Sequence, residues 1–210
     1  MKNKYKLIFL FISTIYSYSQ SNDPLVTSDS VAQNQWVDNI YEKLTLDEKI
    51  GQLFVPLVFS NKDSIHFYKT MELVERYGVG GLIFSKGSTK SHIEWTNNFQ
   101  AKSKVPLLVS MDAEWGLAMR LSDVLAYPWN MTLGAIQDQN LIFQIGKRIG
   151  ENSKRMGLSM NYAPVLDINT NPNNPIIGNR SFGETEKIVS KMAISFMKGI
   201  HSSGILTSGK

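Results

Sequence analysis

The sequence alternates short apolar runs with amphipathic segments, and this alternation restricts the fold more than any other feature. The apolar runs have the length of strands, and the segments between them repeat apolar residues at helical spacing. Strands and helices that alternate with short connections form βα units, in which the strands pair in parallel. The sequence therefore predicts an α/β fold with about five parallel strands. The expected strands are Gln52–Ser60, Gly80–Ser85, Val105–Asp112, Leu158–Ile168 and Ile205–Lys210.

The segments between these strands have the patterns of helices. Thr45 and Glu48 have the spacing of a capping box, which predicts a short helix before the first strand. Gly78 is placed to end a later helix, because glycine is the favoured residue at helix C-termini. Longer helices are expected over residues 62–78, 88–103, 138–157 and 184–204.

The N-terminus has the layout of a signal peptide. Three lysines in the first six residues precede an apolar run at 7–15, and small residues follow it. We predict a signal peptide over 1–19, cleavage near Ser19–Gln20, and export to the periplasm or the extracellular space. The apolar run is too short for a comfortable membrane span, so none is expected after cleavage. The polar segment that follows predicts a loose N-terminal arm over 20–43.

Composition narrows the possible partners and chemistry. The chain has no cysteine, which excludes disulfides, thiolate catalysis and lipid attachment at a cysteine. The formal net charge is +4, but part of it comes from the three N-terminal lysines, and no basic stripe appears later in the chain. No nucleic-acid partner is therefore predicted.

Polar residues gather where the predicted strands end. Asp112 and Lys210 end two of them, and the carboxyl edge of a parallel sheet is where ligands bind. No glycine-rich phosphate loop follows any strand, which argues against a nucleotide ligand. A carboxylate at Asp112, the planar donor groups of Arg120 and Arg180, and the lysine cation suit a ligand with many hydroxyls. This set indicates a sugar-binding edge.

Three motifs carry a resemblance to a known family. The stretches MDAEWGLAMRL, NYAPVLDINTNPNNPIIGNRSFGE and TSGK closely resemble the N-terminal (β/α)8 barrel of family 3 glycoside hydrolases, and most closely its bacterial β-N-acetylglucosaminidase branch. The resemblance runs from about Leu44 to Lys210. It implies a partial (β/α)8 TIM barrel of about the first five βα units, as an incomplete domain over 44–210.

The resemblance also implies a site and a substrate. It assigns Asp112, Arg120, Arg180 and Lys210 to binding of the terminal sugar, which would be β-linked N-acetylglucosamine, as in fragments of peptidoglycan. In this family the acid/base loop and the nucleophilic aspartate follow the position of Lys210. No catalytic residue is therefore assigned within the 210 residues, and the chain alone is expected to be inactive. The resemblance implies no cofactor and no metal.

Several alternatives remain at this point. Glu114 is expected to have a structural role in its turn, and family members often have glycine where Trp115 stands. The domain could belong to a β-glucosidase-type enzyme of the same family or be a non-catalytic carbohydrate-binding module. A different (β/α)8 enzyme, such as an aldolase, would need a Schiff-base lysine; Lys210 is the only candidate, and its motif context points elsewhere. The three histidines lie in predicted helices, where packing or surface roles are expected.

Overall fold

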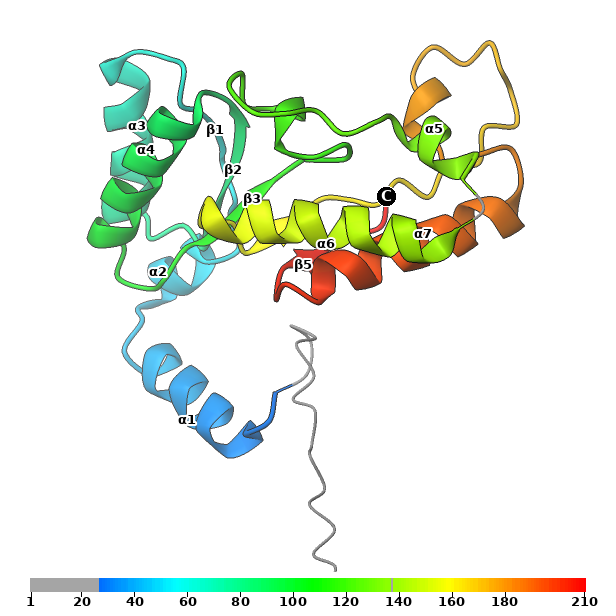
Figure 1. Ribbon diagram of the computed structural model, residues 1–210. Coiled ribbons are helices and arrows are strands. Elements are labelled where there is room, and N and C mark those ends of the chain that lie inside the picture. Colours follow the sequence, from blue (N-terminus) through cyan, green and yellow to red (C-terminus); the bar gives the residue numbers. More distant parts are fainter. Residues whose placement is uncertain (1–26, 137) are drawn as a thin grey trace, which may run out of the picture.

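The computed structural model describes residues 27–136 and 138–210, which form one five-stranded parallel sheet with helices around it (Figure 1). The strands pair in the order β1-β2-β3-β4-β5, which is also their order along the chain. The strands are β1 (Leu57–Phe59), β2 (Gly81–Lys86), β3 (Leu108–Met111), β4 (Met160–Asn161) and β5 (Leu206–Thr207). The α-helices are α1 (Ser30–Tyr41), α2 (Leu46–Gly51), α3 (Ser64–Glu75), α4 (Thr89–Lys102), α5 (Asn130–Gly134), α6 (Gln139–Arg155) and α7 (Glu186–His201).

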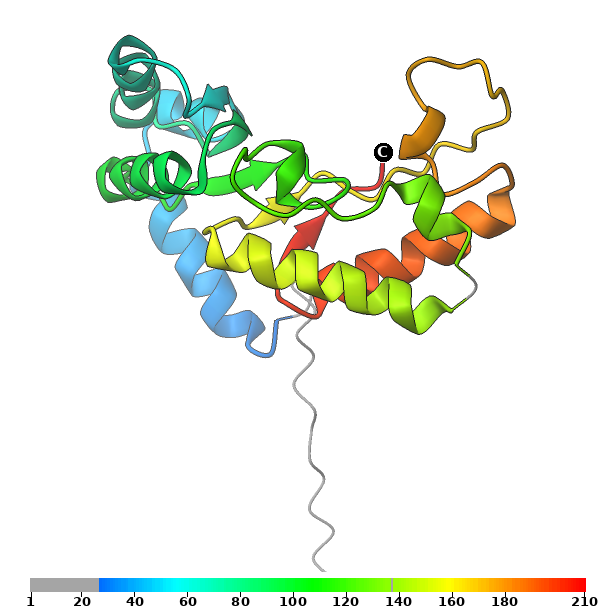
Figure 2. The same ribbon diagram turned by 45° about the horizontal axis from the view of Figure 1, so that its top comes forward.

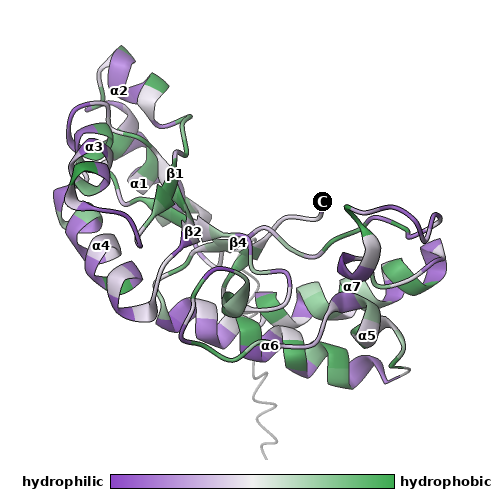
Figure 3. Ribbon diagram, turned by 90° about the horizontal axis from the view of Figure 1, so that it is seen from above, coloured by the Kyte–Doolittle hydropathy of each residue, from purple (hydrophilic) through white to green (hydrophobic). Residues whose placement is uncertain are grey.

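The sheet curves, and helices α3, α4 and α6 follow its convex side (Figure 3). Every pair of neighbouring strands is parallel, with Leu57 opposite Ile83 at one end of the order and Met160 opposite Leu206 at the other. Sequential parallel strands with an outer layer of helices are the arrangement of βα units in a barrel. The prediction of an α/β fold that forms an open segment of a (β/α)8 barrel is confirmed.

The strands are shorter than the sequence predicts. Gln52 was expected to begin the first strand, but it caps the C-terminus of α2, and its N–H donates to the carbonyl of Glu48. The strand expected over Leu158–Ile168 pairs only at Met160–Asn161. Of the apolar residues after it, Ala163 and Val165 are buried, whereas Leu166 and Ile168 are exposed. Pro164 has no N–H to donate to a ladder, but its carbonyl accepts from the Lys210 N–H.

The helix caps agree with the sequence. Thr45 and Glu48 form the predicted capping box at the start of α2. Gly78 follows the end of α3 with a φ of 59°, a left-handed conformation that favours glycine.

Within the predicted N-terminal arm over 20–43, residues 30–41 form α1, a helix that the sequence analysis did not predict. The Asp29 carboxylate accepts from the N–H of Ala32 and caps this helix, which explains why a polar segment becomes helical. None of its residues is buried, and it projects away from the sheet (Figure 1). The predicted signal peptide over 1–19 lies outside the described residues.

Two apolar clusters hold the sheet to its helices. The first packs β1, β2 and β3 against α3 and α4 and centres on Phe84 and Phe99, which are almost fully buried. The second lies under α6 and α7 and contains Ile149 and Phe196. These two helices approach closely at Gly199, where a Cβ atom would lie 2.2 Å from the carbonyl oxygen of Phe143. Any larger residue there would push the helices apart.

Of the helices within residues 27–136 and 138–210, none combines the length and the apolar character that crossing a membrane requires.

Candidate functional site

The carboxyl ends of β3 and β5, together with two loops, gather five charged side chains at one edge of the sheet. Asp112 and Glu114 follow β3 directly, and Lys210 lies three residues after β5. Arg120 lies in the β3–α5 connection after a 3₁₀ turn at Leu117–Met119. Arg180 ends a second 3₁₀ turn in the β4–α7 loop, and both connections lie along the upper edge of the sheet (Figure 2).

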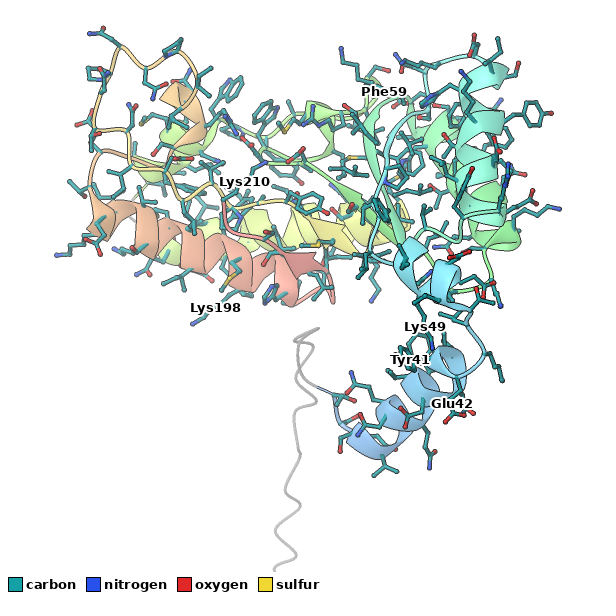
Figure 4. The ribbon with its side chains drawn as sticks, turned by 180° about the vertical axis from the view of Figure 1, so that it is seen from behind. Tyr41, Glu42, Lys49, Phe59, Lys198 and Lys210 are labelled. Carbon is teal, nitrogen blue, oxygen red and sulfur yellow. The ribbon has the colours of Figure 1, made fainter. Side chains whose placement is uncertain are left out.

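The five side chains alternate in charge and contact one another in series. Arg120 donates from Nη2 to Asp112 Oδ2 at 3.0 Å and from Nε to the Asp112 carbonyl at 3.2 Å. Lys210 Nζ donates to Asp112 Oδ1 and lies 2.9 Å from Glu114 Oε1. Lys210 thus links the two carboxylates. Figure 4 shows Lys210 at this edge, whereas Lys198 points outward from α7.

Glu114 holds the remaining cation. Arg180 donates from Nε to Glu114 Oε2 at 3.0 Å and from Nη2 to Oε1 at 2.8 Å, a bidentate pair. Arg180 also donates from Nη1 to the Ile176 carbonyl, which ties the guanidinium to its own loop. Three cations and two anions therefore share one edge, and each anion contacts two of the cations.

Burial divides these residues into two groups. The Glu114 side chain is fully buried, whereas those of Asp112, Arg120, Arg180 and Lys210 keep between 22% and 32% of their surface exposed. The four exposed groups can reach a ligand, whereas Glu114 can act only through its neighbours. The predicted structural role of Glu114 therefore agrees with its position, although it serves the site and not merely its own turn.

The pairing shifts the ionisation of two residues. Burial raises the pKa of Glu114, but the hydrogen bonds and positive charges of Arg180 and Lys210 outweigh that effect and leave the pKa below its ordinary value. The hydrogen bond to Glu114 raises the pKa of Arg180 against the opposite effect of burial. Both groups are therefore charged at neutral pH.

Residues that the sequence analysis did not single out fix the positions of the charged groups. The buried side chain of Asn161, on β4, accepts from the Ala113 N–H at 2.9 Å and donates to the Ala113 carbonyl at 3.1 Å. Ala113 lies between the two acidic residues, so this amide fixes both. Asn130, at the start of α5, donates to the Arg180 carbonyl at 2.8 Å. Asn161 lies within the quoted NYAP motif, which was the only signal in the sequence for its role.

The Arg180 loop is held by Ser181 and not by the Asp167 side chain. The buried Ser181 hydroxyl lies 2.6 Å from the Asp167 carbonyl and accepts from the Gly183 N–H. The backbone carbonyl of Asp167 takes part in shaping the loop. Asp112 does not cap a helix, because its carboxylate contacts Arg120 and Lys210.

A cavity of about 500 Å³ opens beside Arg120. Hydroxyl groups line much of it, from Ser60, Ser88, Ser91 and Ser122, together with Lys86. A larger cavity of about 870 Å³ lies at the opposite edge of the sheet, between α2 and the end of α3, and none of the five charged residues lines it. Of the five charged residues, Arg120 lines the smaller, more polar cavity.

An open barrel segment with charged donors and acceptors at its carboxyl edge has the arrangement of a (β/α)8-type domain, in which that edge carries the ligand site. The chain matches the model of the glycosyl hydrolase family 3 N-terminal domain over residues 45–210, and it belongs to this family.

Individual relatives agree with this assignment. The chain is 32% identical over 152 residues to a protein of Pseudoalteromonas piscicida named beta-hexosaminidase A, covering 66% of this chain and 25% of the relative. It is 27% identical over 175 residues to a beta-N-acetylglucosaminidase/beta-glucosidase of Cellulomonas fimi, covering 83% of this chain and 30% of the relative. The chain thus spans less than a third of the length of either relative.

Solved structures share the fold. A family 3 beta-N-acetylglucosaminidase from Paenibacillus superposes with a TM-score of 0.70 at 31% identity, covering 80% of this chain and 33% of that one. The beta-glucoside phosphorylase BglX, bound to 2FGlc, superposes with a TM-score of 0.80 at 26% identity, covering 87% of this chain and 32% of that one.

Proposed function

We propose that this chain provides the terminal-sugar binding site of a glycosidase that acts on β-linked N-acetylglucosamine. The observation that carries the proposal is the alternating series of charges at the sheet edge. Four of its side chains are partly exposed, and the fifth, Glu114, is buried. One of the four, Arg120, also lines a polar cavity. Membership of family 3 and relatives named β-hexosaminidases support the choice of sugar.

Each exposed residue has a role that its chemistry suits. Asp112 accepts hydrogen bonds from sugar hydroxyls, because an ionised carboxylate has only acceptor sites. Arg120, Arg180 and Lys210 donate to ring hydroxyls and to the acetamido oxygen. The ion pairs among these groups fix their positions before the sugar arrives, which lowers the entropy cost of binding.

The chemical step would use groups that the resemblance assigns to positions after Lys210. Hydrolysis with retention at the anomeric carbon requires one group that acts as the nucleophile and a second that acts as the acid/base. In most glycosidases both groups are carboxyl groups. Glu114 is unsuited to either role, because it is buried and ion-paired with two cations. We propose that the complete enzyme acts with retention on peptidoglycan-derived fragments, and that the residues described here position the terminal sugar.

We also propose export of this protein, with a signal peptide over 1–19, an N-terminal segment over 20–43 and the sugar-binding domain over 44–210. The basic start and the apolar run at 7–15 support this division. Mass spectrometry of the protein from its native host should find an N-terminus near Gln20. Recovery of an intact Met1 from the cytosolic fraction would contradict export.

The binding site is tested with the 210-residue chain and N-acetylglucosamine, by isothermal titration calorimetry. Asp112→Asn should weaken binding by about 10- to 150-fold, because it removes a charged acceptor. Asp38→Asn, on the exposed helix α1, is the matched control and should leave the affinity unchanged. Equal affinities for Asp112→Asn and the unaltered chain would overturn the assignment.

A second sugar separates the two substrate classes. The name of the Cellulomonas fimi relative includes beta-glucosidase, and BglX is a beta-glucoside phosphorylase. Glucose is therefore the sugar whose affinity should be compared with that of N-acetylglucosamine. Tighter binding of N-acetylglucosamine than of glucose supports the proposal. The reverse order would instead assign the domain to the β-glucoside-acting branch.

A further inference from the structure

Two tryptophans pack against each other on chain segments that hold Arg180. The rings of Trp115 and Trp129 have centroids 4.1 Å apart and are tilted by 43° to each other. Trp129 is 43% exposed and Trp115 is half-buried, so the pair leaves aromatic surface open to solvent. Tryptophan has the largest apolar surface of any side chain, which makes an exposed pair unusual without a partner.

Both tryptophans adjoin residues that hold Arg180. Trp115 directly follows Glu114, which binds the Arg180 guanidinium at 2.8 and 3.0 Å. Trp129 directly precedes Asn130, which binds the Arg180 carbonyl at 2.8 Å. The two chain segments that carry the pair therefore meet at Arg180.

The pair is fixed in place. The Tyr127 N–H donates to the Trp115 carbonyl at 3.2 Å, which joins the two segments by their backbones. Gly116, with a φ of 86°, allows the Tyr127 ring to pack against the backbone after Trp115, since a Cβ atom there would lie 2.6 Å from the ring. A rigid aromatic surface costs little entropy when a ligand covers it.

We propose that Trp115 and Trp129 form a stacking surface for the second ring of the substrate, the unit joined to the terminal sugar. This inference rests on the proposed function, because it places the terminal sugar at Asp112, Arg120, Arg180 and Lys210. One face of a pyranose ring presents several C–H groups, and such a face packs on an indole while the ring hydroxyls stay in water. The charged edge would then select the terminal sugar, and the tryptophan pair would favour substrates of two or more rings over a monosaccharide.

The test compares two sugars on the 210-residue chain, N-acetylglucosamine and N,N′-diacetylchitobiose, by isothermal titration calorimetry. The unaltered chain should bind the disaccharide roughly 3- to 10-fold more tightly than the monosaccharide. Trp129→Ala should reduce this ratio towards one, and Trp129→Phe should retain part of it. Trp36→Ala, at another exposed tryptophan on α1, is the matched control and should keep the full ratio. Far-UV circular dichroism of each variant verifies that it is folded.

The outcomes separate this inference from the function on which it rests. If the unaltered chain binds both sugars equally, or if Trp129→Ala weakens both by the same factor, the stacking surface is refuted while the terminal-sugar site stands. An equal loss is what a purely structural tryptophan pair would produce. If the folded chain binds neither sugar, the proposed function fails and the stacking surface fails with it.

Discussion

Glu114 binds Arg180 through both carboxylate oxygens, at 3.0 and 2.8 Å, across 66 residues of sequence. The pair joins the segment after β3 to the loop before α7 through side chains. Because the Glu114 side chain is fully buried, its charge depends on Arg180 and Lys210 for compensation. The following predictions concern this contact and the elements around it.

Glu114→Ala should lower the free energy of unfolding by about 3–5 kcal/mol, because it removes the buried negative charge that pairs with Arg180 and Lys210. The measurement is urea denaturation followed by circular dichroism. Glu151→Ala is the matched control, since Glu151 also pairs with an arginine, at 3.0 Å, but on the exposed surface of α6. The control should change stability by less than about 1 kcal/mol. Similar losses of unfolding free energy for the two variants would show that burial of the Glu114–Arg180 pair adds nothing to stability.

Glu114 should also give the chain a characteristic loss of stability in acid. Its pKa in the folded state lies below the ordinary value of 4.5, so folding favours the ionised carboxylate. The resulting stabilisation is complete above about pH 4.5 and is lost as the pH falls through the lower, folded-state pKa. Unfolding free energies measured between pH 6 and about pH 3 should therefore fall less steeply for Glu114→Gln than for the unaltered chain. Parallel curves would contradict an ionised Glu114.

Asn161→Ala should destabilise the fold by about 1–3 kcal/mol, because it leaves the buried N–H of Ala113 without its acceptor and removes one of the two donors to the Ala113 carbonyl, the other being the Gly116 N–H. It should also weaken binding of N-acetylglucosamine, since Asp112 and Glu114 flank Ala113. Asn98→Ala is the control: Asn98 donates at 2.7 Å to the Glu94 carbonyl on the exposed face of α4. Denaturant unfolding should show less than about 0.5 kcal/mol for this variant. A neutral Asn161→Ala would mean that the acidic segment is fixed by other contacts.

The chain should self-associate through the region around β1. Leu53, Phe54 and Leu57 are between 50% and 82% exposed, and β1 pairs only with β2 among the described residues. Figure 3 shows apolar ribbon at this end of the sheet. An exposed strand edge with apolar side chains favours association with other copies. Analytical ultracentrifugation should find concentration-dependent association of the 210-residue chain.

The double variant Leu53→Lys with Phe54→Lys should shift that association to higher protein concentration. Leu125→Lys is the control, because Leu125 is 90% exposed but lies in the β3–α5 connection, away from β1. A monomeric unaltered chain, or an equal effect of the Leu125 variant, would contradict association through β1.

The sequence by itself determined the order and type of the main elements. Apolar runs such as the one before Asp112 and amphipathic segments such as the one that becomes α6 follow from local periodicity, which depends only on near neighbours. The capping box of Thr45 and Glu48 was readable for the same reason, since its two hydrogen bonds close within three residues. The three family motifs placed Asp112, Arg120, Arg180 and Lys210 at one edge before any contact was known.

Only the tertiary structure decided how these residues act together. Glu114 looked like a turn residue, and its burial against Arg180 depends on a loop folding back from 66 residues away. Asn161 gave no signal beyond its place in a quoted motif, because its partners on Ala113 are backbone groups that any residue would present. The ends of the strands also depended on pairing between strands. Gln52 caps the C-terminus of α2 and does not belong to β1. Local patterns fix elements, whereas burial and long-range pairing fix which charges are shielded and which remain open to a ligand.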